Sequence, residues 1–260
     1  VQNIASLAAD AGGDITKLLE AKYPGGSQTV AQQVQEAIAT IGSKEGFSHL
    51  CLAQLGPGDT CITPDPAFPI HIYAPAMAGA EVVQLPLGCD LDFLDRVEQK
   101  ILDVKRDKGA APKLLILNYP HNPTSMTIDL AFGEKAVAIC RRHGVMLVSD
   151  FAYGEVCFDG YRAPSVFEAR GAKDLAVEFT TMSKSYNMAG WRIGFCTGNP
   201  DMVKALATIK GYYDYGIFAP IQIASTIAMR HHLEQPNEQS KIYAKRRDTL
   251  CRGLDRLNWT

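Results

Sequence analysis

The 260-residue sequence lacks several features that would define its function at once. It has no apolar run near the ~20 residues that a membrane-spanning helix needs. A net charge of −2 at pH 7 gives no electrostatic reason to expect nucleic acid or an anionic membrane as a partner. It also has no internal repeat and no low-complexity block. With 47% hydrophobic and 21% charged residues, the composition is that of an ordinary globular protein.

The cysteines and the first residues bear on the cellular compartment. Seven scattered cysteines, an odd number without a CxxC pair, predict free thiols in a reducing compartment rather than disulfides or a zinc site. The chain starts at Val1 without Met and without a charged and apolar leader. We therefore expect no secretory signal, a start that is processed or trimmed, and a cytoplasmic protein.

Short apolar segments alternate with longer amphipathic ones from about residue 40 onward. Strands are predicted at 60–63, 81–85, 113–118, 145–150, 175–180 and 192–198. Helices are predicted at 44–55, 67–78, 91–104, 129–143 and 200–212, and the pattern after residue 219 is helical. This alternation predicts an α/β fold with a mostly parallel central sheet and helices on both faces.

The first forty residues differ from the rest. They are rich in Ala, Gln and Gly, and we predict two short helices joined by the turn sequence YPGG at 23–26. The expected organisation is a divergent helical segment at 1–40, a large domain at 41–235 and a C-terminal helix at 236–260.

Polar side chains follow three of the predicted strands. LLILN leads into YPHNPTS, MLVSD ends on Asp150, and LAVEFT leads into the Thr181–Lys184 segment. Ligands of open α/β sheets bind at the carboxyl ends of the strands. A carboxylate, an amine and a nearby arginine, Arg192, suggest a cofactor with a cationic end and an anionic end.

Two strings, SKSYNMAGWRIGF (183–195) and IKGYYDYGIFAPIQIA (209–224), carry a family resemblance. The sequence from about residue 41 to 260 resembles the class I/II, fold type I aminotransferases that use pyridoxal 5′-phosphate (PLP). It is most similar to bacterial alanine (glutamate–pyruvate) aminotransferases and their aspartate and LL-diaminopimelate relatives. The resemblance implies that the large domain binds PLP and that the protein is a homodimer with sites completed across a two-fold axis.

The resemblance assigns the reacting end of the cofactor site. Lys184 would bind PLP covalently and move the substrate proton, and Asp150 would pair with the pyridine nitrogen. Tyr153 and Asn122 would hydrogen-bond the phenolic oxygen, and Phe68 would stack on the ring. The alternatives are a surface lysine, a helix cap at Asp150, an ordinary Asn-Pro turn and a core aromatic.

The resemblance also assigns the phosphate end. Arg192 would bind the phosphate with its planar guanidinium, and Thr181 and Ser183 would add hydroxyl donors. Ser43 and Lys44 would offer backbone N–H groups at a helix N-terminus. A plain helix N-cap at Ser43 and a surface salt bridge at Arg192 are the alternatives.

Prolines and histidines complete the candidates. Pro66 and Pro123 are predicted to follow cis peptide bonds in tight turns at the site. The histidines other than His121 show no ligand spacing with cysteines or carboxylates, so we predict no metal site.

Two departures from the family pattern concern the ends of the chain. Because the sequence stops at Thr260, we expect no counterpart here of the C-terminal small domain or of its arginine for the substrate carboxylate, which the resemblance would imply. Tyr23 is the only candidate for the tyrosine that would reach the phosphate in the neighbouring subunit.

The expected function is transamination between a small amino acid, of the alanine, glutamate or aspartate type, and a 2-oxo acid by a ping-pong mechanism. One alternative is a truncated PLP-binding paralogue with a structural or assembly role and no transaminase activity. Another is a different PLP reaction on the same scaffold, such as carbon–sulfur cleavage.

Overall fold

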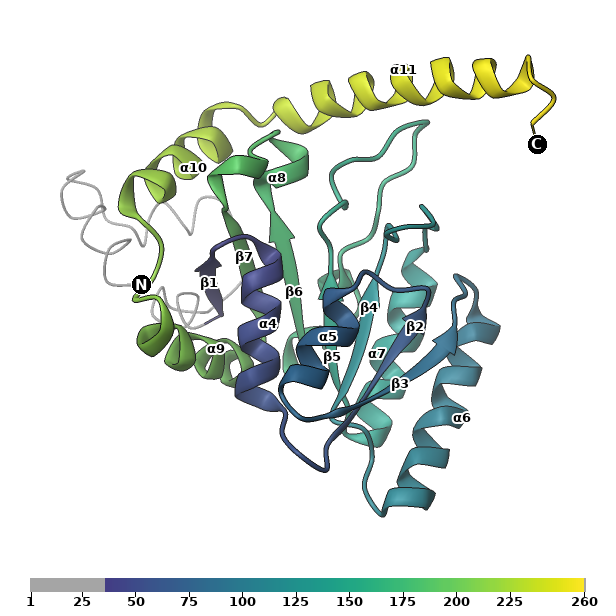
Figure 1. Ribbon diagram of the computed structural model, residues 1–260, viewed down its shortest axis with the longest axis vertical. Coiled ribbons are helices and arrows are strands. Elements are labelled where there is room, and N and C mark those ends of the chain that lie inside the picture. The colour runs from purple at the N-terminus through teal and green to yellow at the C-terminus, as the bar shows by residue number, and fades with distance from the viewer. Residues whose placement is uncertain (1–35, 260) are drawn as a thin grey trace.

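A seven-stranded mixed sheet forms the centre of the computed structural model, which describes residues 36–259 (Figure 1). Its strands run in the order β1 (Ala37–Thr40), β7 (Gly194–Gly198), β6 (Ala176–Thr181), β5 (Met146–Asp150), β4 (Leu114–Asn118), β2 (Thr60–Asp65) and β3 (Glu81–Pro86). Strands β2 to β6 pair in parallel, and β7 is antiparallel to both of its neighbours. The mostly parallel sheet predicted from the sequence is confirmed.

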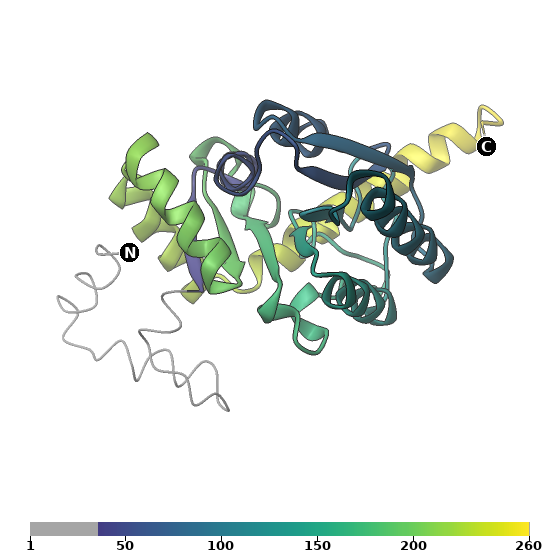
Figure 2. The same ribbon diagram turned by 90° about the horizontal axis from the view of Figure 1, so that it is seen from below.

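Helices cover both faces of the sheet, as Figure 2 shows. Helices α4 (Ser43–Gln54), α5 (Ile70–Met77) and α9 (Pro200–Tyr213) pack on one face around a core that includes Phe47 and Phe179. Helices α6 (Leu91–Lys108) and α7 (Leu130–His143) pack on the other face around Phe93 and Phe132. Because both faces are covered, the parallel strands are apolar along most of their length.

The chain ends in helices that extend beyond the sheet. The short α8 (Met182–Ser185) follows β6, and α10 (Ala219–His231) and α11 (Gln235–Asp255) follow α9. Helix α11 crosses above the edge at which β6 ends (Figure 1). Single 3₁₀ turns lie at Val166–Glu168, Ala172–Asp174 and Ala189–Trp191. No helix within residues 36–259 combines the length and apolar character that crossing a membrane requires.

Local sequence signals set the ends of the two helices on the second face. Asp90 and Asp129 accept hydrogen bonds from the backbone N–H three residues on, at 2.8 and 2.9 Å, and so cap α6 and α7. Gly109 and Gly144 end the same helices with φ values of 75° and 68°, which favour glycine. These signals explain why the predicted helices nearly match the observed ones.

One prediction about the N-terminal segment is wrong. Residues 37–40, expected to be helical, form strand β1, which pairs antiparallel with β7 at the edge of the sheet. The remaining helical prediction, for residues up to 35, and the candidate Tyr23 lie outside the described residues. The cis peptide bonds predicted before Pro66 and Pro123 are confirmed, and a third precedes Pro120. All seven cysteines are free thiols.

Candidate active site

A cavity of about 260 Å³ opens at the carboxyl edge of the sheet. Strands β4, β5 and β6 are parallel, and the register places Asn118 beside Asp150 and Asp150 beside Phe179. The segments that follow these strands therefore meet at one place. All ten residues named from the sequence line this cavity, together with three others: Ser43, Lys44, Phe68, Asn122, Asp150, Tyr153, Thr181, Ser183, Lys184 and Arg192, with Asn118, Ala152 and Ala189.

Asp150 presents one unpaired carboxylate oxygen. Its side chain is buried, and Oδ2 lies 2.9 Å from Nε2 of the buried His71. Oδ1 has no hydrogen-bond partner within the described residues. A buried polar atom without a partner is costly, by about 1–3 kcal/mol, unless a ligand supplies one. Asp150 is thus ready to accept a hydrogen bond from a cationic or N–H group in the cavity, and it caps no helix.

A hydrogen-bond chain fixes the loop beside Asp150. Asn118 is buried at the end of β4; its Nδ2 donates to the Asp150 carbonyl at 2.7 Å, and its Oδ1 accepts the Asn122 N–H at 3.0 Å. Asn122 Nδ2 in turn donates to the Tyr153 hydroxyl at 3.4 Å. Burial, with the charge of Asp150, raises the pKa of Tyr153. The Tyr153 phenol is therefore neutral at neutral pH and available as a donor.

Lys184 and Arg192 approach the cavity without acidic partners. Lys184 Nζ lies 5.7 Å from the centre of the Tyr153 ring, and the Arg192 guanidinium donates to the Ala189 carbonyl at 3.0 Å. Neither side chain takes part in an ion pair with any residue from 36 to 259. Two cations that line one cavity without carboxylate partners indicate a site for an anionic ligand.

The N-terminus of α4 adds backbone donors next to Arg192. No side chain in the described part of the chain caps this helix, so the N–H groups of its first residues, Ser43 and Lys44, stay available. The N-cap is Gly42, with φ 74°, and a Cβ there would lie 2.4 Å from Arg192 Nη2. A glycine is thus required for this close approach between the guanidinium and the helix start.

The hydroxyl groups of Thr181 and Ser183 form a third side of the cavity and differ in their hydrogen bonds. Thr181 Oγ1 lies 2.9 Å from the Ile193 carbonyl oxygen and accepts the Ser183 N–H at 3.1 Å. A hydroxyl has one proton, so Thr181 donates either to that carbonyl or to Ser183 Oγ, which also lies 2.9 Å from it. When Thr181 donates to Ser183 Oγ, the Ser183 proton is free to point into the cavity that Ser183 lines. Thr181 therefore shapes the turn into α8, and Ser183 is the hydroxyl donor.

The aromatic side of the cavity is formed by Phe68. Its ring stands edge-on to His71 at 5.8 Å, and Lys44 Nζ lies 5.8 Å from its centre. The ring is partly buried and lines the cavity, so it offers an apolar surface to a flat ligand.

Comparison with known proteins identifies the family of this chain. The model of the family described as "Aminotransferase class I and II" matches residues 13–260. The chain belongs to the class I and II aminotransferases. The glutamate-pyruvate aminotransferase AlaC of Escherichia coli (strain K12) is 48% identical over 224 residues, which are 86% of this chain and 53% of that protein.

Two further class I and II aminotransferases extend the comparison. The LL-diaminopimelate aminotransferase of Moorella thermoacetica is 39% identical over 225 residues, 86% of this chain and 57% of that protein. A solved aminotransferase from Staphylococcus aureus matches with a TM-score of 0.79 at 29% identity, over 94% of this chain and 62% of that one. The present aminotransferase chain spans about half the length of these curated relatives.

The cavity of this aminotransferase fits the cofactor that the family implies. PLP has a pyridine nitrogen, an aldehyde and a phosphate on one flat ring. The unpaired Asp150 Oδ1 suits the nitrogen, and the Lys184 amine suits the aldehyde. Arg192 and the uncapped α4 N-terminus suit the phosphate.

Sequence reasoning missed two residues of this site. His71 was set aside because it has no metal-ligand spacing, yet it contacts Asp150 from 79 positions away. Asn118 was recognised only as the end of a strand, although it connects Asp150 to Asn122. The sequence signal for His71 is its position three residues after Phe68, in the helix predicted at 67–78.

Proposed function

We propose that this protein is a PLP-dependent aminotransferase that moves an amino group between a small amino acid and a 2-oxo acid. One observation carries the proposal: in a chain of this family, Lys184, Arg192 and an Asp150 oxygen that has no partner among residues 36–259 line the same cavity. The family relatives point to the reaction, and the cavity has the donors that its cofactor needs.

The residues would hold PLP at both ends. Arg192, the Ser43 and Lys44 N–H groups and the Ser183 hydroxyl bind the phosphate, with Thr181 supporting the Ser183 turn. Asp150 holds a proton on the pyridine nitrogen, because a buried carboxylate stabilises a positive charge beside it.

The ring itself would be held by four side chains. Tyr153 and Asn122 orient the phenolic oxygen, Phe68 covers one face of the ring, and Lys184 attaches it covalently. His71 keeps the Asp150 carboxylate in position through their 2.9 Å contact.

The cofactor and the protein side chains would contribute different parts of the chemistry. Bound PLP supplies the electron sink for the electron pair left at the substrate Cα when its proton leaves. Lys184 Nζ, as a free amine, would take that proton from the substrate Cα and deliver it to C4′, the aldehyde carbon of the cofactor. Tyr153 stays a neutral phenol at neutral pH, because burial and Asp150 raise its pKa, and so it can donate to the phenolic oxygen.

The substrate proposal is the alanine/glutamate couple. It rests on the glutamate-pyruvate aminotransferase that is 48% identical, against 39% for the LL-diaminopimelate enzyme.

We further propose a homodimer in a reducing, cytoplasmic compartment. Four aromatic side chains around the end of α9 are largely exposed: Tyr212 at 82%, Tyr213 at 66%, Tyr215 at 91% and Phe218 at 70%. Exposed aromatics gathered in one short segment are typical of protein interfaces, and a second copy of this chain is the proposed occupant. Seven free thiols support the compartment.

Absorption spectroscopy tests the function. Purified protein mixed with PLP is expected to show the visible band of lysine-bound cofactor, and alanine or glutamate is expected to bleach it. Lys184→Ala should lack the band, whereas Lys204→Ala, a change of an exposed lysine on α9, should keep it. Binding of PLP without any response to amino donors would refute transamination, and a band retained in Lys184→Ala would refute the assignment of the lysine.

A further inference from the structure

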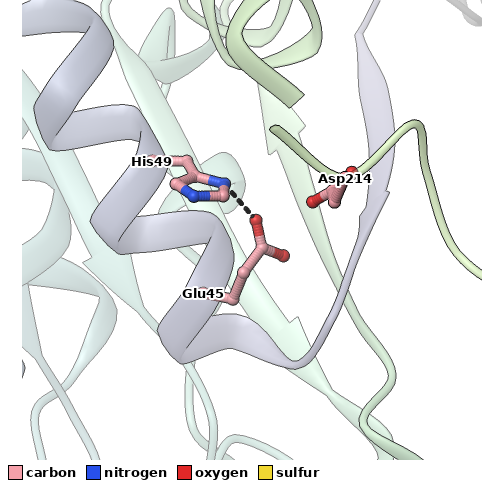
Figure 3. Close-up of side chains that lie close together, drawn as sticks. All are labelled: Glu45, His49 and Asp214. Carbon is pink, nitrogen blue, oxygen red and sulfur yellow. Dashed lines mark ion pairs between the residues drawn. The ribbon is translucent and has the colours of Figure 1, made fainter. Parts of the chain in front are cut away.

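A half-buried ionic cluster, in which only the lysine is fully buried, lies directly behind the N-terminus of α4. Glu45 and His49 extend from α4, and Lys210 and Asp214 come from the end of α9. His49 Nδ1 lies 2.5 Å from Glu45 Oε1, and Asp214 faces them from the neighbouring segment (Figure 3). Lys210 is only 2% exposed, which is rare for a lysine.

The cation of this cluster is Lys210 itself. Ligand atoms of Glu45, His49 and Asp214 lie within 4.8 Å of one another, a spacing that would suit a metal ion. Lys210 Nζ, however, donates to both Glu45 oxygens at 3.0 Å and to Asp214 Oδ2 at 2.6 Å. An ammonium group has three protons, so these carboxylate oxygens already have their cationic partner.

The positive charge of Lys210 lies between the carboxylates of Glu45 and Asp214. Burial alone would raise the pKa of Asp214, but hydrogen bonds from Lys210 and the Gly216 N–H outweigh it and lower that pKa. The Asp214 carboxylate is therefore charged at neutral pH, with the Lys210 ammonium as its partner. A buried ion pair contributes little net stability compared with apolar packing, so a positioning role has to be considered.

Glu45 connects Lys210 to the backbone turn that borders the cavity. It is the third residue of α4, and its Oε2, one of the oxygens held by Lys210, also accepts the Ile41 N–H at 2.6 Å. Ile41 immediately precedes Gly42, against which the Arg192 guanidinium lies. One carboxylate thus connects the buried ammonium to the turn that presents the Ser43 and Lys44 N–H groups.

Charge gives a second reason for the lysine. The Glu45 carboxylate and a bound phosphate would both lie in the first turn of α4, where the helix dipole favours negative charge. Two anions at one helix end repel each other unless a cation neutralises one of them. Lys210 does so from the side away from the cavity, since it is absent from the cavity lining.

We propose that Lys210 is a positioning residue for the phosphate end of the cofactor site, acting through Glu45 on the 41–44 turn. This inference rests on the proposed PLP function. It predicts that Lys210 affects the binding of the phosphate group selectively, while the ring and aldehyde are bound as before.

The test compares PLP with pyridoxal, which has the same ring and aldehyde but no phosphate. Lys210→Met is expected to weaken PLP binding about tenfold, equal to ~1.4 kcal/mol, and to leave pyridoxal binding within about twofold. The ratio of the two dissociation constants, measured by titration of the visible band, cancels the covalent step at Lys184. Lys204→Met, on the exposed side of the same helix, is the matched control and should leave both constants unchanged.

The outcomes separate this inference from the function it rests on. Equal weakening of PLP and pyridoxal, or no change in either, would overturn the positioning role while the PLP site stands. Failure of the unmodified protein to bind PLP would instead refute the proposed function. Should Lys210→Met not fold, Lys210→Arg keeps the cation with a different geometry, and it is expected to change the ratio about twofold; an unchanged ratio there would also overturn the inference.

Discussion

At the scale of single residues, the site contains charged and polar groups that lack partners within the described residues. Asp150 is buried with one oxygen on His71 and one without a partner, and Lys184 and Arg192 have no carboxylate partner in the described residues. The buried Asp150 oxygen without a partner destabilises the cofactor-free protein, because desolvated polar atoms prefer partners. A ligand that satisfies all three would therefore bind strongly and stabilise the fold.

Asp150→Asn tests the role of the negative charge on Asp150. Asparagine keeps the size and a hydrogen bond to His71 but removes the negative charge, so we expect the rate of amino transfer to fall roughly 10²-fold or more. The thermal midpoint of the cofactor-free protein should not fall, since a buried charge is removed. Steady-state kinetics and thermal unfolding measure the two effects.

The matched control for that variant is Asp90→Asn, at the N-cap of α6. Asparagine caps helices as well as aspartate does, so rate and stability should both stay near those of the unmodified protein. If Asp150→Asn retained more than half of the rate, the charge at this position would have no role in the chemistry.

At the scale of elements, the active site depends on how closely β7 approaches α4. A Cβ on Gly194, the first residue of β7, would lie 2.6 Å from the Ser43 nitrogen and 2.8 Å from the Thr180 carbonyl oxygen. Both are backbone atoms, which cannot rotate away as a side chain would. The start of α4 and the end of β6 are thus held against this glycine, and with them the two sides of the proposed phosphate site.

Gly194→Ala is expected to separate these elements. Overpacking of this kind costs about 1–3 kcal/mol of unfolding free energy, and displacement of the Ser43 N–H should also weaken PLP binding. Urea unfolding and a PLP titration measure the two effects.

Gly133→Ala, the same chemical change at another position, is expected to have the opposite effect on the free energy of unfolding. Gly133 lies in α7, and a Cβ there meets nothing within 4 Å. Alanine should stabilise the helix by up to about 1 kcal/mol and leave PLP binding unaltered. Equal effects of the two substitutions would show that the close contact at Gly194 does not constrain the site.

At the scale of the whole molecule, the proposed dimer makes a prediction about assembly. The aromatic segment that includes Tyr215 and Phe218 is exposed, and it continues the chain directly from the Lys210 cluster. Burial of these side chains against a second copy would remove a large apolar area from water. Assembly would then also support the helix end that holds Lys210.

The double variant Tyr215→Ser/Phe218→Ser is expected to shift the protein toward monomer by at least about tenfold in the dimer dissociation constant. Leu102→Ser changes an apolar side chain that is 43% exposed on α6, and it should leave assembly unchanged. Sedimentation velocity over a concentration series measures both. A monomeric unmodified protein at every concentration would contradict the proposed dimer.

Much of the sheet and most of its covering helices were predictable because their signals are local. Apolar runs such as 113–118, aspartate caps and terminal glycines lie within a few residues of the structure they specify. Strand β1 was missed because its four residues, AIAT, have no alternating pattern of their own. Its strand character comes from pairing with β7, which lies 154 (Thr40 with Gly194) to 160 (Ala37 with Thr197) residues further along the chain.

Residue order alone was enough to identify ten of the thirteen residues that line the cavity, because the strand ends and the family motifs are short continuous segments of sequence. Folding was needed to bring His71 to Asp150 across 79 positions and Lys210 to Glu45 across 165. Such contacts depend on how α5 and α9 pack against the sheet and α4, and a single sequence contains no local signal for that packing. The residues that would touch the cofactor are therefore readable from the chain, whereas those that hold them in place emerge only when distant helices meet.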